Sequence, residues 1–243
     1  KLLRRIVKAG GRPAMGTYDP HGVFLASGIA IDVNGKLWVA ERADGPKRIS
    51  VWDATSGAFE REYFGGSDYF AYAFINPAIP DEIYCHNVLW RIDWKTNAVT
   101  PISTIWRATT PDMIDEPSPS AYPRGFYYLS ATNGNQYGIG TTKNDRKHVL
   151  YRREGNLFKP FFASFEFNRS SKIFEPLGSP ELDDPKNTPD GWYFWQDAND
   201  DQRVQLNELH RVPNKNARLG LKTIAPDRKS TRLNSSHSSV SRM

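Results

Sequence analysis

The sequence predicts an all-β protein built from four-stranded antiparallel units, arranged like the blades of a β-propeller. The first observation is composition: 18 Gly, 17 Pro and 13% aromatic residues are typical of short strands joined by many turns. The second observation is a pattern of strands and turns that recurs along the chain from residue 28 onward. Together they favour a repeat protein of β-structure over a helical bundle.

The clearest unit spans residues 28–66 and contains four predicted strands in order. GIAIDV is a β-branched run closed by the turn Asn34-Gly35, which is a strong hairpin signal. LWVAE, RISVWD and AFEREYF follow as the second, third and fourth strands, separated by the loop RADGPK and the turn ATSG. Four antiparallel strands in this order form one propeller blade.

Three further units repeat the pattern more weakly, over residues 71–105, 125–163 and 189–226. In the second unit Asp93 takes the place of Asp53, and in the third VLYRREGN stands where the first has SVWDATSG. In the fourth, the turn PDG and the strand WYFWQD match NGK and LWVAE. Insertions rich in Pro, Ser and Asp separate the later units and indicate surface loops. We therefore expect residues 1–228 to form a partial propeller of about four blades.

The first unit resembles the NHL repeat. LWVAER, RISVWD, a Ser-Gly turn and a Phe before two glycines follow that family's order of strand, polar loop, arginine, strand and glycine turn. Two features depart from it: Glu41 stands where the family usually has Asp, and ADGPK replaces a short Asn-His loop. The resemblance implies a ring of about six blades. We therefore expect an incomplete six-bladed propeller, a fragment, rather than a small ring.

The charge lies mainly at the ends of the chain. The formal net charge is +5, but residues 1–8 and 229–243 carry the excess of Lys and Arg, so the middle is near neutral. This argues against a nucleic-acid partner, which would need a basic surface. The segment 229–243, KSTRLNSSHSSVSRM, resembles translated adapter sequence from environmental assemblies, and a native disordered tail is the alternative.

The sequence shows no membrane span, since no stretch approaches about 18 consecutive apolar residues. It leaves the compartment open, with an extracellular or periplasmic location favoured over the others.

One loop of the fourth unit, DANDDQRVQLNE, carries a calcium-ligand pattern. Its oxygen donors occupy positions one, three, five, seven, nine and twelve: Asp197, Asn199, Asp201, the carbonyl of Arg203, Gln205 and Glu208. The spacing resembles an EF-hand loop and the calcium loops of integrin-type propeller repeats. It departs at position six, where Gln202 replaces the usual turn glycine. The loop therefore has two interpretations, a calcium site that stiffens it or an acidic, solvated hairpin loop.

The loops between the second and third strands of the units share one face of a propeller and form a candidate ligand rim. The candidates on this rim are Glu41, Arg42, His86, Asn87, Lys143 and Asp145. For Glu41 an ion pair at the strand end is the simpler interpretation, and His86 is read first as an ordinary loop histidine.

The sequence contains no HExxH helix, no GxSxG elbow and no phosphate-binding loop. We therefore expect a binding or scaffold module for a protein, glycan or small-molecule ligand, rather than an enzyme. The alternative is a metal-dependent propeller enzyme of the gluconolactonase or lyase type, which needs ligands from several blades converging near the axis. Convergence of Glu41, His86, Asn87 and Asp145 would favour that alternative.

Overall fold

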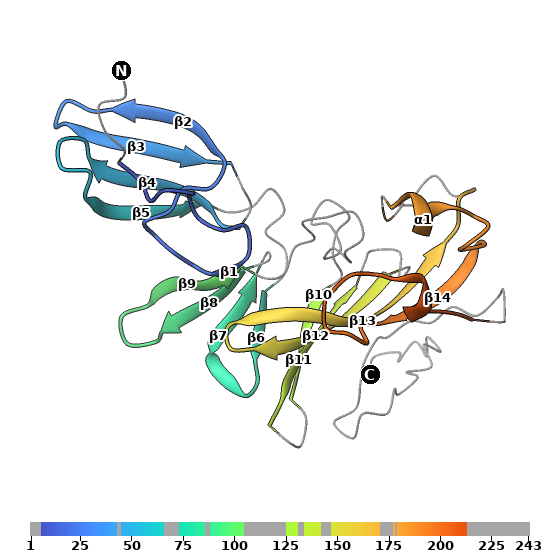
Figure 1. Cartoon of the computed structure of the whole chain (residues 1–243). Coiled ribbons are helices and arrows are strands. Elements are labelled where there is room, and N and C mark those ends of the chain that lie inside the picture. The colour runs from blue at the N-terminus through green and yellow to red at the C-terminus, as the bar shows by residue number, and fades with distance from the viewer. Residues whose placement is uncertain are drawn as a thin grey trace, which may run out of the picture.

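The described strands form three antiparallel sheets that follow one another along the chain, except that the short strand β1 precedes the first sheet and joins the second (Figure 1). The computed structural model describes residues 6–42, 45–65, 73–85, 88–104, 125–130, 134–141, 147–170, 177 and 179–212. Within these ranges every strand pair is antiparallel. None of the described helices is long and apolar enough to cross a membrane.

The first sheet has four strands in chain order: β2 (Ala26–Ile31), β3 (Lys36–Glu41), β4 (Lys47–Asp53) and β5 (Phe59–Gly65). The turn between β2 and β3 contains Gly35 at φ 72°, a left-handed conformation that glycine adopts without strain. Asp32 closes this turn, because its Oδ1 accepts the backbone N–H of Asn34 at 2.9 Å and of Lys36 at 2.9 Å. The predicted Asn34-Gly35 hairpin is therefore present.

The second sheet is built the same way, with one short strand added at its edge. Its strands are β6 (Ala73–Asn76), β7 (Ile79–Cys85), β8 (Val88–Asp93) and β9 (Ala98–Thr104), followed in space by β1 (Gly16–Thr17). In the turn between β8 and β9, Asn97 adopts φ 57° and Asp93 Oδ1 accepts the N–H of Lys95 at 2.9 Å. Asparagine tolerates this left-handed conformation better than most residues.

The third sheet has six strands. They are β10 (Gly125–Ser130), β11 (Gln136–Thr141), β12 (Lys147–Glu154), β13 (Leu157–Phe167), β14 (Gly191–Gln196) and β15 (Leu209–Arg211). The helix α1 (Pro180–Asp183) lies in the connection from β13 to β14, and the 3₁₀ turn η2 (Leu206–Glu208) precedes β15.

A continuous apolar core covers the third sheet and reaches the second. It comprises Tyr84, Val149, Tyr151, Phe158, Ala163, Phe165, Phe167, Leu182, Tyr193, Trp195 and Val204. Tyr84 comes from β7, so the second sheet contributes to the same core as the third. Leu182 of α1 is buried in it as well, at 2% exposure, which explains why the short helix is held against the strands.

A polar cluster also joins the second and third sheets. Arg153 of β12 donates to both carboxylate oxygens of Glu82 in β7, at 2.6 Å and 2.9 Å. Gln136 of β11 accepts a further hydrogen bond from Arg153 at 2.6 Å, and Asn76 donates to Glu82 at 3.2 Å. A bidentate pair of this kind fixes the relative orientation of the two side chains as well as their distance, so it holds the two sheets in one arrangement.

The segment before β2, residues 12–24, is called the N-terminal strap because it links the first two sheets. Tyr18 donates its hydroxyl to Glu62 Oε2 of the first sheet at 2.6 Å, and its backbone N–H to the carbonyl of Ile102 in the second at 2.9 Å. The first two sheets also contact each other directly, because the rings of Phe64 in β5 and Trp90 in β8 pack edge to face with 5.2 Å between their centroids.

The predicted fold class is confirmed: the chain is an all-β, propeller-like protein made of antiparallel sheets. The fourth predicted unit, residues 189–226, contributes β14 and β15, and these extend the third sheet instead of forming a separate one among the described residues. The blade boundaries stay a prediction. The segment 229–243 lies outside the described residues.

Candidate functional site

The predicted calcium loop lies between β14 and η2 and is tightly turned. Asp200 and Gln202 both have positive φ, at 61° and 59°. Gln202 occupies the sixth position of the loop pattern, where calcium loops normally use glycine for a sharp turn. The backbone therefore makes the turn at this position despite the missing glycine.

Hydrogen bonds draw positions one, three, five, six and nine of the loop together. Asp197 accepts the backbone N–H of Asp201 at 3.2 Å and of Gln202 at 3.0 Å. Asp201 in turn accepts the amide groups of Asn199 at 3.0 Å and Gln205 at 2.8 Å. Four of the predicted ligand residues thus face one another around Asp201.

The other two predicted ligands, Glu208 and the carbonyl of Arg203, have surroundings that differ from those of the four residues around Asp201. Glu208 is buried, at 3% exposure, and its two oxygens accept Trp195 Nε1 and the backbone N–H of Ala198, each at 2.9 Å. The N–H of Arg203 donates to Asp201 Oδ1 at 2.8 Å. In this conformation Glu208 ties the end of the loop back to β14, and its oxygens point to those donors rather than to Asp201.

The loop concentrates negative charge. Burial raises the pKa of Asp197, the N–H of Gln202 opposes the rise, and the charges of Glu208 and Asp200 add to it. Arg152 of β12 partly offsets this charge, because its guanidinium pairs with Asp200 at 2.9 Å. Among the described residues, no three His, Cys, Asp or Glu side chains gather as a metal site.

The rim candidates divide into two groups. Glu41 and Arg42 lie at the end of β3, with Glu41 buried and Arg42 exposed. The other four candidates, His86, Asn87, Lys143 and Asp145, lie outside the described residues.

Glu41 is enclosed by two guanidinium groups. Its Oε2 accepts Arg12 Nη2 at 2.9 Å and the backbone N–H of Phe24 at 2.8 Å, while Oε1 lies 3.2 Å from Arg48 Nε. The side chains of Glu41 and Arg48 are fully buried, and that of Arg12 is 1% exposed. This cluster fastens the N-terminal strap to the first sheet.

Sequence reasoning missed the partners of Glu41. Arg12 lies 29 positions away, and no local pattern connects the two residues. Arg48 gave a signal, because it is a charged residue within the otherwise mostly apolar predicted strand RISVWD. Tyr18 completes the cluster by accepting from Arg48 Nη1 at 2.9 Å. Burial and the hydrogen bond to Glu62 raise the pKa of the Tyr18 hydroxyl, so it stays protonated.

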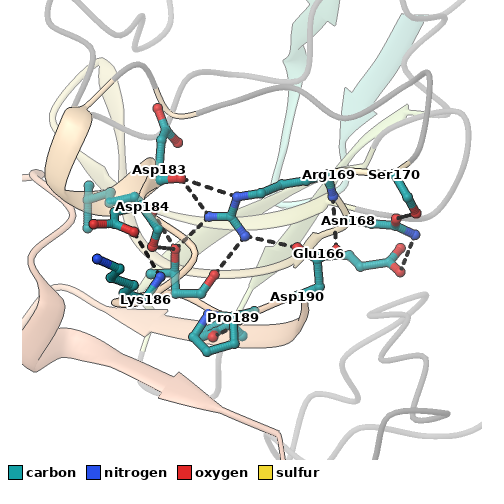
Figure 2. Close-up of polar contacts among 12 residues, drawn as sticks. Glu166, Asn168, Arg169, Ser170, Asp183, Asp184, Lys186, Pro189 and Asp190 are labelled. Carbon is teal, nitrogen blue, oxygen red and sulfur yellow. Dashed lines mark hydrogen bonds and ion pairs between the residues drawn. The ribbon is translucent and has the colours of Figure 1, made fainter.

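A second polar cluster, also missed, surrounds Arg169 at the end of β13 (Figure 2). Its guanidinium donates to the carbonyl of Asp183 at 2.9 Å, to the carbonyl of Thr188 at 2.7 Å and to Asp190 Oδ1 at 2.9 Å. The guanidinium also lies over the ring of Phe167, 5.2 Å from its centroid. Because most acceptors are backbone carbonyls of one connection, the cluster fastens the segment from α1 to β14 and offers little to a ligand.

Comparisons with known proteins do not assign the chain to a family. No protein-family model matches the sequence, and no curated protein is similar to it.

Solved structures give weak similarities. One is a Lactobacillus plantarum protein (14% identity, TM-score 0.27, covering 56% of this chain and 40% of that one). Another is Kuenenia stuttgartiensis hydrazine synthase (13% identity, TM-score 0.26, 70% and 51%). A third is the β-propeller domain of Myceliophteria thermophila Cps50 (Swd1) (8% identity, TM-score 0.17, 82% and 90%). The chain thus spans about half or less of the first two proteins. At scores this low, the fold assignment rests on the order of the strands.

Proposed function

We propose that this chain is a non-catalytic binding or scaffold module of the NHL propeller type, which presents its loops to a protein, glycan or small molecule. The observation that carries the proposal is the environment of Glu41. A metal ligand or general base at a channel mouth needs an accessible oxygen. Both oxygens of Glu41 instead face Arg12, Phe24 and Arg48 inside the protein.

The NHL type is supported by the first sheet. The arginine of the RISVWD strand, Arg48, pairs with the acidic residue at the end of the preceding strand, Glu41. In the sequence pattern these two positions flank the polar loop, and their pairing gives both a structural role. Arg42, the next residue, stays exposed and available to a ligand on the rim.

The binding proposal is tested with the full chain on glycan and peptide arrays. A bound probe should lose affinity in Arg42→Ala, and Arg61→Ala should leave binding unchanged, because Arg61 is an exposed arginine on the outer strand β5. Equal loss in both variants would indicate non-specific charge attraction and contradict a rim site.

The enzyme alternative is tested separately with glucono-δ-lactone in the presence of Ca²⁺, Zn²⁺ or Mn²⁺. We expect no hydrolysis above the rate without protein. Metal-dependent turnover by the wild-type chain would overturn the binding proposal, and its loss in a Glu41→Gln sample that circular dichroism shows to be folded would give Glu41 a chemical role.

Calcium bound to the loop 197–208 is part of the proposal. The donor set fits a hard cation: Asp197, Asp201, the amide oxygens of Asn199 and Gln205, and the Arg203 carbonyl. The left-handed turn at Gln202 allows the chain to wrap as such loops do. Glu208 would support the loop from behind, since Trp195 and Ala198 already occupy its oxygens. Bound calcium would neutralise the crowded carboxylates and stiffen the loop.

Calorimetric titration of CaCl₂ into the chelator-treated chain tests this proposal. We expect a dissociation constant of about 10⁻⁴–10⁻³ M, as in extracellular modules, because the glycine of position six is missing. Asp201→Asn should abolish the signal, and Asp93→Asn, in a turn of the second sheet, should retain it. No heat and no rise in melting temperature with wild-type protein would contradict a calcium site and favour the acidic hairpin loop.

A further inference from the structure

The turn between β2 and β3 holds an asparagine that is open to reaction with its own backbone. Asn34 is exposed, and its side-chain amide makes no hydrogen bond to any residue that the structure describes. The next residue is Gly35, and apart from its chain neighbours no atom lies within 4 Å of the place where a Cβ on it would stand. The backbone nitrogen of a glycine can therefore be approached with little steric hindrance.

The reaction available to this pair is deamidation. The nitrogen of Gly35 attacks Cγ of Asn34, the bond from Cγ to Nδ2 breaks, and Nδ2 leaves as ammonia with the proton of the Gly35 N–H. A cyclic imide remains. Water then breaks one of its two ring C–N bonds, which gives either aspartate or isoaspartate, whose backbone runs through Cγ. Water is the only other reactant, and asparagine is a thermolabile residue in proteins.

The other asparagines of the described ranges are less open to this reaction. Each of them precedes a residue with a side chain, which hinders the approach to the backbone nitrogen. Asn76 precedes Pro77, whose nitrogen carries no hydrogen. Asn133 also precedes a glycine, Gly134, but lies outside the described residues. Asn34 is therefore the described asparagine that is best placed to react.

The hydrogen bonds of the turn restrain the reaction. The N–H of Gly35 donates to the carbonyl of Asp32 at 3.0 Å, and Oδ1 of Asp32 accepts the N–H of Asn34 at 2.9 Å. The other carboxylate oxygen, Oδ2, accepts Nε1 of Trp38 at 2.9 Å, which anchors the Asp32 side chain to β3. The attacking nitrogen is thus held by the Asp32 carbonyl, and it must be released before it can reach Cγ.

We propose that Asn34 is a site of spontaneous deamidation and that Asp32 controls its rate by closing the turn. Asp32 is a positioning residue in this reaction: its side chain fixes the N–H groups of Asn34 and Lys36, and the backbone nitrogen of Gly35 lies between them. The inference does not rest on the proposed binding function, because this turn precedes β3 and Arg42 of the rim follows the other end of the strand.

Deamidation changes the turn in two ways. It adds a second carboxylate to a turn that already holds an ionised one, since the indole N–H of Trp38 and then the backbone N–H of Lys36 hold the pKa of Asp32 below its ordinary value. The isoaspartate form also lengthens the backbone by one atom, within a turn whose hydrogen bonds fit the ordinary length. We therefore expect the deamidated protein to melt at a lower temperature than the fresh protein.

Peptide mapping by mass spectrometry tests the site in the full chain, incubated for weeks at neutral pH and physiological temperature. It measures the fraction of each asparagine that has become an acid, and isoaspartate methyltransferase detects the isoaspartate product. We expect Asn34 to convert faster than Asn97, which is an exposed turn asparagine followed by Ala98. No conversion at Asn34, or equal conversion at both positions, would overturn the proposed site.

Variants at position 32 test the control by Asp32. Asp32→Ala should raise the rate at Asn34 by at least about fivefold, because the turn loses the hydrogen bonds to a charged acceptor. Asp32→Asn retains an acceptor oxygen and should stay near the wild-type rate. The matched control is Asp93→Ala, which removes the acceptor of the corresponding turn in the second sheet and should leave the rate at Asn34 unchanged.

The same measurement in urea separates the folded turn from the local sequence. Unfolded wild-type protein and unfolded Asp32→Ala should deamidate at Asn34 at one common rate, faster than the folded wild-type protein. Equal rates in the two folded proteins, a difference between them that persists in urea, or acceleration by Asp93→Ala would each overturn the role of Asp32.

Discussion

Buried charged residues in this protein are stabilised by pairing with opposite charges. Glu41, Arg12 and Arg48 are all removed from water, and each ion loses solvation that its partners and backbone groups must replace. Removing one member leaves the others buried without compensation. The energetic role of Glu41 therefore exceeds that of any ion pair on the surface.

For Glu41→Gln we expect a loss of about 3–5 kcal/mol in the free energy of unfolding, because two buried guanidinium groups lose their anion. Urea unfolding followed by tryptophan fluorescence measures it. Glu60→Gln is the control, since Glu60 pairs with Lys36 where both side chains are partly exposed to solvent. Equal losses in the two variants would show that Glu41 acts as a surface charge.

The one cysteine gives a chemical test of burial. Burial raises the pKa of Cys85 to about 11, so the thiol carries its proton at neutral pH and is a poor nucleophile. We expect no reaction with Ellman's reagent in the native state and one reacting thiol in urea. Rapid labelling of the native protein would place Cys85 at an accessible position.

At the scale of elements, connections are fastened by few residues. The segment from α1 to β14 has a helix of only four residues, with no side-chain hydrogen bond at its N-cap. Arg169 holds this segment in place, because its guanidinium donates to the carbonyls of Asp183 and Thr188 (Figure 2). A short helix without a good cap depends on such tertiary contacts.

Replacing Arg169 by Ala should loosen this connection without unfolding the sheets. We expect hydrogen exchange at Asn187 and Thr188, whose N–H groups bond the carbonyl of Asp184, to accelerate by about tenfold or more. Arg61→Ala should leave these amides unchanged. Uniform acceleration across β12 and β13 would mean that Arg169 stabilises the whole sheet instead.

Turns were the most predictable elements. Asn34-Gly35 identified the hairpin of β2 and β3 because only certain residues adopt its backbone conformation, and that information is local. The partners of β14 could not be predicted in the same way. Its sequence fits a strand in any sheet, and it pairs with β13 across a connection of more than twenty residues. Arg12 and Arg169 were missed for the same reason, since their partners lie far along the chain.

At the scale of the whole molecule, the pair of Glu82 and Arg153 joins the second and third sheets. Burial would raise the pKa of Glu82, but Arg153, with help from Asn76 and Arg91, outweighs burial and holds the pKa below its ordinary value. A carboxylate with a depressed pKa stabilises the folded state above its ordinary pKa, and this contribution is lost as the pH falls toward the lower folded value.

Lowering the pH should therefore weaken the protein partly through Glu82. Between about pH 5 and pH 3 the melting temperature of wild-type protein should fall more steeply than that of Glu82→Gln, which cannot titrate at this position. The variant should already be less stable at pH 7, because Arg153 loses a buried partner. Parallel curves for the two proteins would show that Glu82 does not contribute to acid unfolding.

The N-terminal strap has a consequence for synthesis on the ribosome. β1 at residues 16–17 pairs with the last residues of β9, Ser103 and Thr104. Its partner is translated roughly 90 residues later, which at about 5–20 residues per second is a wait of roughly 5 to 20 seconds. During that time the nascent strap can contact only the first sheet through Arg12 and Tyr18. A segment translated before the first sheet thus completes the second sheet last, and translation speed sets the earliest moment at which β1 can pair with β9.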